Sequence, residues 1–161
     1  MTTKQGDIAL LSDPVAQELL QSRNLAQLAY VWNDGTPRVT PIWFHWNGQE
    51  IVFGTFPSAP KLKAIRSGSK LAATITSVEP SRVLYIRGAA NVELVDGVVP
   101  EYVLAAKRYL GDEAGAGWIQ QVSAMFPQTT RITLVPEWVG VLDFEKRFPS
   151  PIEKAMAGAG D

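Results

Sequence analysis

The loop before a helix predicted over 61–67 has the composition of a site for a phosphate group. Thr55 and Ser58 offer hydroxyl donors, and Lys61 and Lys63 follow in the first turn of the predicted helix. Lysines in that position oppose the helix dipole, whereas a bound anion would satisfy both the lysines and the dipole. A solvated basic turn is the alternative interpretation, because clustered charges usually lie at the surface.

A proline inside a predicted strand marks a second candidate region. Pro41 lies within a strand expected over 38–46. Because proline removes a ladder hydrogen bond, this strand is expected at a sheet edge, where backbone groups are free to face a ligand. An edge strand with nothing bound is the other interpretation.

Arg87 and Gly88 lie side by side in a long strand expected over 82–95. A glycine within a strand indicates a bulge or a close approach of another backbone segment. The neighbouring guanidinium could therefore be presented where the chain comes close to a ligand. A surface salt bridge is the alternative, since most arginines are exposed.

His45 is the only histidine, and the chain has no cysteine. A site with two histidine ligands for a metal is therefore impossible within one chain, as are disulfides, thiolate nucleophiles and iron–sulfur clusters. His45 could act as a general base, or it could be a half-buried strand histidine. Strand alternation would place it on the same face as Val39, Pro41 and Trp43.

The composition predicts one globular domain. The chain has 161 residues, of which 46% are hydrophobic and 19% charged, and its formal net charge is −1. This balance argues against a nucleic-acid-binding protein, which needs a basic face. No apolar run approaches the roughly 20 residues needed to span a bilayer, so a soluble cytoplasmic protein is expected. Glycine-rich dinucleotide, P-loop and nucleophile-elbow motifs are not found in the sequence.

Antiparallel strands dominate the expected fold. Turn signals separate three strands that should form a meander, over 25–32, 38–46 and 50–56. Further strands are expected over 70–77, 82–95, 129–135 and 138–144. Helices are expected from Pro14 and over 61–67, 100–110 and 118–126. A sheet that is apolar on both faces tends to close into a barrel, so the predicted fold class is mainly β with flanking helices.

Two segments are expected to be less regular, and the aromatic residues need a partner. Residues 111–117 should form a flexible joint, and the tail from Arg147 should be loosely ordered.

The five tryptophans should lie mostly in the core, with some left for a planar aromatic ligand or a dimer interface. A barrel has only one interior, so apolar residues on its outer face favour a two-fold partner.

Several segments in order resemble one family, the pyridoxamine 5′-phosphate oxidase-like split β-barrel flavoproteins. The similarity is carried by residues 35–44, 51–55, 61–63, 70–75, 86–94 and 130–139. Members of this family bind FMN or the deazaflavin coenzyme F-420. The resemblance implies one split-barrel domain over 1–145 with a tail over 146–161. It also implies a homodimer with two cofactor sites shared between subunits.

The resemblance also implies roles for individual residues. Five residues are expected to line the flavin: Arg38, Thr40, Pro41, Ile42 and Trp43. Arg87 is expected to be a further cofactor contact. Those expected to hold its phosphate are Thr55, Ser58, Lys61 and Lys63. The sequence departs from the oxidase itself, because Pro60-Lys61 replaces an Arg-Lys pair and the C-terminal Arg-x-His signature is missing. The named oxidase activity is therefore not expected.

The first functional hypothesis is a flavin- or deazaflavin-dependent oxidoreductase acting on a small molecule. Flavins carry the redox chemistry themselves, so a protein without cysteine can serve, and no catalytic residue is assigned. The alternative is a non-catalytic flavin-binding or storage protein, or a haem-handling split barrel with His45 as its only available histidine ligand. A cofactor-free dimer is the third hypothesis.

Overall fold

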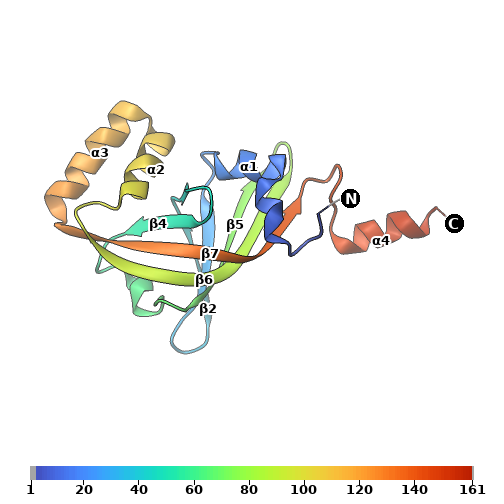
Figure 1. Ribbon diagram of the computed structural model, residues 1–161, viewed down its shortest axis with the longest axis horizontal. Coiled ribbons are helices and arrows are strands. Elements are labelled where there is room, and N and C mark those ends of the chain that lie inside the picture. Colours follow the sequence, from blue (N-terminus) through green and yellow to red (C-terminus); the bar gives the residue numbers. More distant parts are fainter. Residues whose placement is uncertain (1–2, 161) are drawn as a thin grey trace.

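The computed structural model describes residues 3–160 and contains one bent, seven-stranded antiparallel sheet (Figure 1). The strand order is β2-β1-β5-β6-β7-β4-β3. The strands are β1 (Ala26–Val31), β2 (Pro37–Ile42), β3 (His45–Trp46), β4 (Ile51–Thr55), β5 (Lys70–Ser77), β6 (Arg82–Asp96) and β7 (Gln128–Leu142). The helical elements are η1 (Ile8–Ser12), α1 (Pro14–Leu20), η2 (Pro60–Lys63), α2 (Pro100–Leu110), α3 (Asp112–Met125) and α4 (Ser150–Gly158). The predicted mainly β class with flanking helices is confirmed.

The long strands β6 and β7 form the middle of the sheet, and their pairing contains one irregularity. The register shifts between Arg87 and Gly88, where the partners change from Trp138 to Pro136. A Cβ atom on Gly88 would lie 1.8 Å from the carbonyl oxygen of Val135, so only glycine fits there. The predicted close backbone approach at Gly88 is confirmed, and the two strands expected over 129–144 are one bulged strand.

Both hairpins of the predicted meander are present, because β1 pairs with β2 and β3 pairs with β4. The predicted middle strand is broken, however, so the two hairpins lie at opposite edges of the sheet, which does not close into a barrel. Among residues 3–160, β2 pairs with β1 alone, whereas β4 pairs with β3 and β7. The strand expected over 38–46 ends at Ile42 because Phe44 turns into the core, where its exposed fraction is 0%. The edge position predicted for Pro41 is confirmed, because β2 is a terminal strand of the sheet.

Two of the predicted helical segments differ from the structure. The helix expected over 61–67 is only the single 3-10 turn η2, because no side chain caps Ala59 and the chain turns to bury Ala64 and Ile65. The joint expected over 111–117 is Gly111 alone, because α3 begins at Asp112. Gly115 of α3 lies so close to α2 that a Cβ atom would meet the Cα atom of Lys107 at 2.8 Å.

The hydrophobic core lies inside the bend of the sheet, under η1, α1 and α2. Its largest fully buried side chains include Phe44, Phe53, Leu28, Ile86 and Ile132. All five tryptophans are half-buried rather than fully buried. Trp43 and Trp46 pack against the core without lying inside it, so the expectation that most of the tryptophans lie in the core is wrong.

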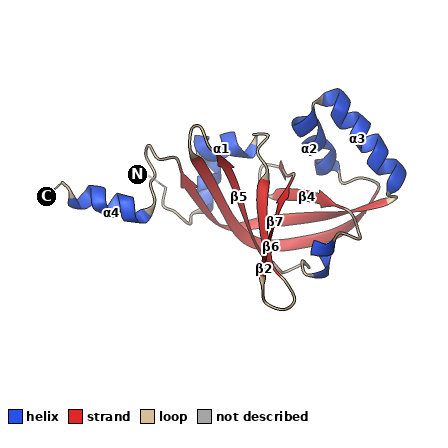
Figure 2. Cartoon of the chain, turned by 180° about the vertical axis from the view of Figure 1, so that it is seen from behind, coloured by secondary structure: helices blue, strands red, loops and turns tan. Residues whose placement is uncertain are grey.

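The tail expected to be loosely ordered instead forms α4, which extends away from the sheet in both views (Figures 1 and 2). Pro151 in its first turn and the alanines that follow suit a helix. The chain before α4 is tied to the body by Arg147, whose guanidinium donates to the carbonyl of Thr3 at 2.6 Å and to Asp13 at 3.4 Å. Across residues 3–160, every helix is too short or too polar to cross a bilayer.

Candidate functional site

A cavity of about 280 Å³ lies where the end of β4 meets the end of β2 and the first turn of α2. It brings together five of the residues predicted to bind a cofactor, which come from three separate segments of the chain: Pro41, Ile42, Trp43, Thr55 and Lys61. The other lining residues are Leu25, Gly54, Phe56 and Tyr102. We call this space the Lys61 cavity.

Lys61 is the only charged residue that lines this cavity. Its side chain is half-buried, and among residues 3–160 its ammonium group makes no hydrogen bond or ion pair. Burial lowers the pKa of Lys61 below its ordinary value of 10.5, because the charged form loses solvation. An anion bound in the cavity would relieve that cost, so the residues present fit a phosphate group.

The helix-dipole argument for the phosphate does not hold in the structure. Since η2 is a single 3-10 turn, Lys61 and Lys63 lie in its last turn rather than in the first turn of a longer helix. The role of η2 is to position Lys61: it follows the end of β4 and brings Lys61 into the same cavity as Thr55. The Thr55 side chain is buried, with 7% of the residue exposed.

Stacked aromatic rings form a wall of the Lys61 cavity. The ring of Trp43 stacks on Tyr102 at a centroid distance of 5.7 Å and on Tyr109 at 5.1 Å. The Tyr102 hydroxyl accepts a hydrogen bond of 2.9 Å from Nε1 of Trp118 on α3. Burial raises the pKa of Tyr102, so this phenol stays protonated near neutral pH. The wall is therefore held in place before any ligand arrives, and it suits a flat aromatic ring.

Sequence reasoning missed Tyr102, because the packing of α2 against β4 leaves no local pattern. The contact depends on Gly54, at which a Cβ atom would lie 2.6 Å from the Cβ atom of Tyr102. No role was assigned to Gly54 from the sequence, where it directly precedes Thr55. A glycine inside a strand is the one signal that could have indicated a close neighbour there.

The structure places the remaining predicted residues outside the lining of the cavity. Ser58 and Lys63 are exposed, and the Lys63 carbonyl accepts from Arg66 at 3.1 Å. Arg38 is exposed, with its guanidinium 5.0 Å from the ring centroid of Trp32. Thr40 is half-buried, and its hydroxyl donates to the carbonyl of Pro41 at 3.4 Å.

Arg87 lies elsewhere on the sheet and does not line the Lys61 cavity. Its guanidinium stacks on Trp138, with 4.0 Å to the ring centroid, rather than forming the surface salt bridge considered from the sequence. It lines a separate hollow of about 330 Å³ beside the ion pair of Lys70 with Glu137, whose nitrogen and oxygen are 2.9 Å apart. Two exposed apolar residues of β1 and β2 lie on the same side of this region, Val31 at 59% and Val39 at 67%.

His45 is a half-buried strand histidine, as the second interpretation of the sequence predicted. It is not part of the cavity lining, and alternation along one strand does not apply to it, because β2 ends at Ile42 and β3 begins at His45. Its Nδ1 atom is buried and has no hydrogen-bond partner within residues 3–160. Burial, together with the charge of Arg108, lowers the pKa of His45, while Glu101 acts in the opposite direction.

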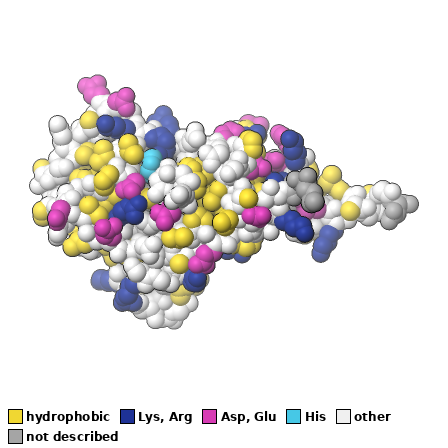
Figure 3. Space-filling model, viewed as in Figure 1, with side chains coloured by type: hydrophobic (Ala, Val, Ile, Leu, Met, Phe, Trp, Pro, Cys, Tyr) yellow, Lys and Arg dark blue, Asp and Glu magenta, His cyan; other side chains and the backbone are white. Residues whose placement is uncertain are grey.

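Glu101 belongs to an ion pair between α2 and β7. Its Oε1 atom accepts from Nε and Nη2 of Arg131 at 3.0 and 2.7 Å, and these bonds lower the pKa of the carboxyl. The single histidine (cyan) reaches the surface, with basic side chains (dark blue) near it in this view (Figure 3). The pair ties α2 to the sheet, and so it supports the wall that Tyr102 forms.

Comparison with known proteins gives one family match and a set of structural neighbours. The model of the family described as pyridoxamine 5′-phosphate oxidase matches residues 12–143. No curated protein matches the sequence.

Three solved structures share the fold at low sequence identity. An F420 reductase is 23% identical with a TM-score of 0.58, over 77% of this chain and 94% of the other. A conserved hypothetical protein from Mycobacterium tuberculosis is 19% identical with a TM-score of 0.63, over 89% and 92% of the two chains. A FAD and heme binding protein from Mycobacterium smegmatis is 19% identical with a TM-score of 0.54, over 88% and 75%.

Proposed function

Because this chain belongs to the pyridoxamine 5′-phosphate oxidase family, we propose that it binds FMN or coenzyme F-420 and acts as an oxidoreductase on a small molecule. The observation that carries the proposal is Lys61, a half-buried cation without a protein partner among the described residues, beside a stacked aromatic wall. The names of two structural neighbours, an F420 reductase and a FAD and heme binding protein, support a redox cofactor of this kind.

Each group that lines the Lys61 cavity has a role in holding the cofactor. Lys61 and Thr55 bind its phosphate, and the backbone of Pro41 and Ile42 lies against its ring at the open edge of the sheet. Trp43 keeps its position because it stacks between Tyr102 and Tyr109. The bound cofactor supplies hydride transfer, which needs no nucleophile from the protein. The protein's contribution is to anchor the phosphate and to keep one wall of the site dry.

The cavity in one chain is open to solvent and of modest size. Its volume of about 280 Å³ lies just below the range of roughly 300–1,000 Å³ in which drug-sized ligands are held. We therefore place the second wall on another copy of the chain, as in a homodimer with shared sites. The exposed Val31 and Val39 provide apolar surface for such a contact. Sedimentation at low micromolar concentration tests this, because a 17.6 kDa monomer that binds FMN tightly would contradict it.

The phosphate anchor is tested by titrating FMN and F-420 into apo-protein. A charge-assisted hydrogen bond contributes about 1.5–3 kcal/mol, so Lys61→Ala should weaken binding by roughly tenfold to a hundredfold. Lys63→Ala is the matched control, since Lys63 is exposed and does not line the cavity, and it should change Kd by less than about threefold. Equal effects of the two substitutions would contradict this assignment.

A second candidate function is binding or storage of a cofactor without turnover, with haem included. The name of the mycobacterial FAD and heme binding protein supports it, and His45 is the only histidine that could ligate iron. Since His45 does not line the Lys61 cavity, a haem ligated by His45 would bind outside that cavity. The absorption spectrum of the purified protein distinguishes flavin, deazaflavin and haem. Haem in the wild type that is lost in His45→Ala would favour the second candidate.

A further inference from the structure

The second half of β7 has an edge that no strand covers. On one side β6 pairs with β7 from end to end, whereas on the other side β4 pairs only with Thr130–Leu134. Over 135–142, no second strand among residues 3–160 pairs with β7. A strand edge of this kind presents free N–H and C=O groups, to which another chain can add a strand. What covers this edge therefore decides whether a further copy of the chain can pair with it.

The N-terminal segment Thr3–Gly6 covers the edge, and we call it the strap. Figure 1 shows the start of the described chain (dark blue) near the end of β7. The backbone N–H of Gly6 donates to the carbonyl of Val139 at 2.8 Å. At the other end of the strap, the carbonyl of Thr3 accepts from the Arg147 guanidinium at 2.6 Å. The strap is thus fixed at both ends, although its residues lie outside every strand and helix.

Gln5 takes the place of a partner strand at Val141. Its side-chain Nε2 donates to the Val141 carbonyl at 2.6 Å, and its Oε1 accepts from the Val141 N–H at 2.9 Å. Residues that form a hydrogen-bonded pair in an antiparallel ladder exchange the same two bonds between their backbone groups. The carboxamide of one side chain therefore replaces a peptide group of a neighbouring strand.

Two glycines allow the strap to lie close to β7. A Cβ atom on Gly6, whose φ is +98°, would lie 2.8 Å from Nε1 of Trp138, so the strap crosses the indole ring at a residue without a side chain. A Cβ atom on Gly140 would lie 2.7 Å from the Trp138 ring and 3.2 Å from Oε1 of Gln5. The strap therefore has one defined position on β7.

The strap is weakly held, and the strand that it covers favours pairing with itself. Thr3 and Gly6 are half-buried, and the two strap residues between them are exposed. Segments with few buried groups and exposed hydrogen bonds open locally without unfolding of the whole protein. Residues 138–142 have the sequence WVGVL, which contains no charge and no proline and is rich in strand formers. Such a segment pairs readily with copies of itself when its edge is free.

We propose that the edge of β7 over 139–141 is a pairing surface for the same edge of a second copy, and that Gln5 keeps it closed. In antiparallel pairing about a two-fold axis at Gly140, Val139 of each chain lies opposite Val141 of the other. Backbone bonds between the copies then replace the two bonds that Gln5 makes. Glycine at the axis adds no side chain between the two strands.

This pairing surface is separate from the Lys61 cavity. Neither the strap nor residues 139–141 line that cavity. The homodimer proposed above uses Val31 and Val39 instead, so pairing at β7 would join one dimer to another. Cofactor binding and edge pairing therefore succeed or fail independently.

The first test compares the wild type with Gln5→Ala, which removes both bonds to Val141. Gln128→Ala is the matched control, because Gln128 is an exposed glutamine at the other end of β7 that donates to Asp96 at 2.9 Å. At low protein concentration, hydrogen exchange at the Val141 N–H should be at least about tenfold faster in Gln5→Ala than in the other two proteins. At high concentration, sedimentation should show Gln5→Ala at twice the mass of the wild-type species, with Val141 protected again.

A labelled peptide with the sequence of residues 137–143 tests the edge without relying on self-association. It should bind Gln5→Ala at least about tenfold more tightly than the wild type or Gln128→Ala, as measured by fluorescence anisotropy. The same peptide with Val141→Pro should not bind, because proline lacks the N–H that the pairing needs. Unchanged exchange at Val141 in Gln5→Ala would show that Gln5 does not close the edge. Faster exchange without assembly or peptide binding would show that the edge does not pair, and either result would overturn the proposal.

Discussion

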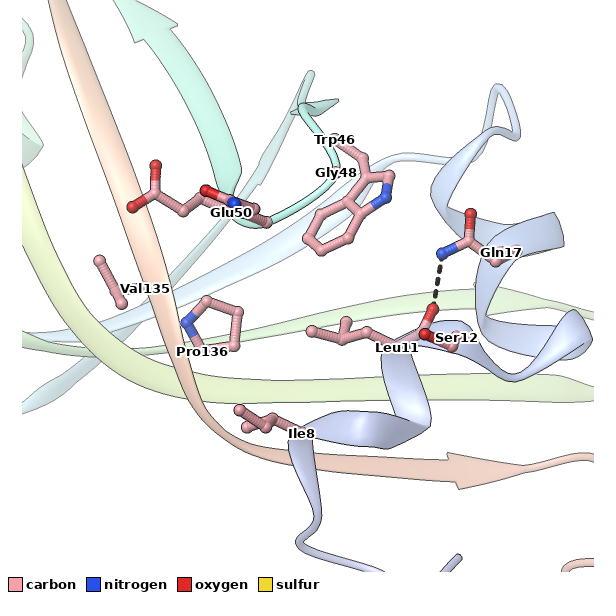
Figure 4. A pocket seen from close by; sticks show the side chains of 10 residues that line it. Ile8, Leu11, Ser12, Gln17, Trp46, Gly48, Glu50, Val135 and Pro136 are labelled. Carbon is pink, nitrogen blue, oxygen red and sulfur yellow. Dashed lines mark hydrogen bonds between the residues drawn. The ribbon is translucent and has the colours of Figure 1, made fainter.

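Two cavities lie at the ends of β4: the Lys61 cavity, and a second one of about 610 Å³ lined by Trp46, Glu50 and Pro136 among others, which we call the Trp46 cavity (Figure 4). Each contains a tryptophan: Trp43, from the segment that joins β2 to β3, lines the first, and Trp46, the last residue of β3, lines the second. The Lys61 cavity contains a lysine and no carboxylate, whereas the Trp46 cavity contains Glu50 and no basic residue. The Lys61 cavity thus offers a cation to an anionic ligand beside an indole ring, whereas no basic residue lines the Trp46 cavity.

The fully buried Phe44 lies between the two tryptophans in sequence and fixes them. Because the Phe44 side chain occupies the core, the chain does not continue as a regular strand. Trp43 and Trp46, on either side of this break, line different cavities. Arg108 supports this turn by donating to the Phe44 carbonyl, with its guanidinium 5.0 Å from the Phe44 ring centroid. One interruption in an edge strand thus creates a wall for each cavity.

Reversing the charge of the Lys61 cavity should have the largest effect. Lys61→Glu removes an attraction of about 1.5–3 kcal/mol and adds a repulsion, so FMN affinity should fall by more than a hundredfold. Lys63→Glu is the matched control, because it reverses an exposed charge outside the cavity, and it should change FMN affinity by less than about threefold. Titration of FMN into both variants checks this. Equal losses of affinity in the two variants would contradict the assignment.

A smaller effect is expected from filling the space between β4 and α2. In Gly54→Ala the new Cβ atom would lie 2.6 Å from that of Tyr102, so α2 must shift. Overpacking of this kind costs about 1–3 kcal/mol of stability. We expect a lower Tm and weaker FMN binding, because the Tyr102 wall moves.

Thermal unfolding and FMN titration measure the two effects of Gly54→Ala. Gly117→Ala is the matched control, since a Cβ atom there meets no atom within 4 Å. Gly117→Ala lies in α3 and should leave FMN binding unchanged while it keeps or raises the Tm. Normal FMN affinity in Gly54→Ala would separate the Tyr102 wall from the site.

The fold could be predicted from the sequence where local chemistry decides it. Strand patterns, the edge position of Pro41 and the close approach at Gly88 follow from alternation and from what proline and glycine permit. Thr55 and Lys61 line the same cavity, as expected from their positions at and just after the end of a strand.

Contacts between distant segments could not be predicted in this way. The predicted middle strand of the meander is broken because Phe44 turns into the core. The helix predicted over 61–67 is only a short 3-10 turn, because burial of Ile65 overrides local helix propensity. Tyr102 was missed because its place depends on how α2 packs over Gly54. The Trp46 cavity was missed because η1 and β7 are far apart in the sequence.

The smallest predicted effect concerns His45, which lies between the two cavities in sequence. Its pKa is below the ordinary value of 6.5, with burial as the main cause and Arg108 as the second. As pH falls below about 6.5, the unfolded chain takes up a proton that the folded protein does not, so stability should fall. His45→Gln should show a smaller loss of stability between pH 7 and pH 5. Denaturant unfolding at both values checks this, and an equal loss in both proteins would contradict it.

The central claim is that Lys61 holds the phosphate of a flavin cofactor. It is tested most directly by comparing FMN with riboflavin, which carries the same ring without the phosphate, in the wild type and in Lys61→Ala. The wild type should bind FMN at least about tenfold more tightly than riboflavin, and Lys61→Ala should lose most of that preference while it binds riboflavin normally. Equal affinity of the wild type for the two ligands, or a preference that persists in Lys61→Ala, would contradict the claim.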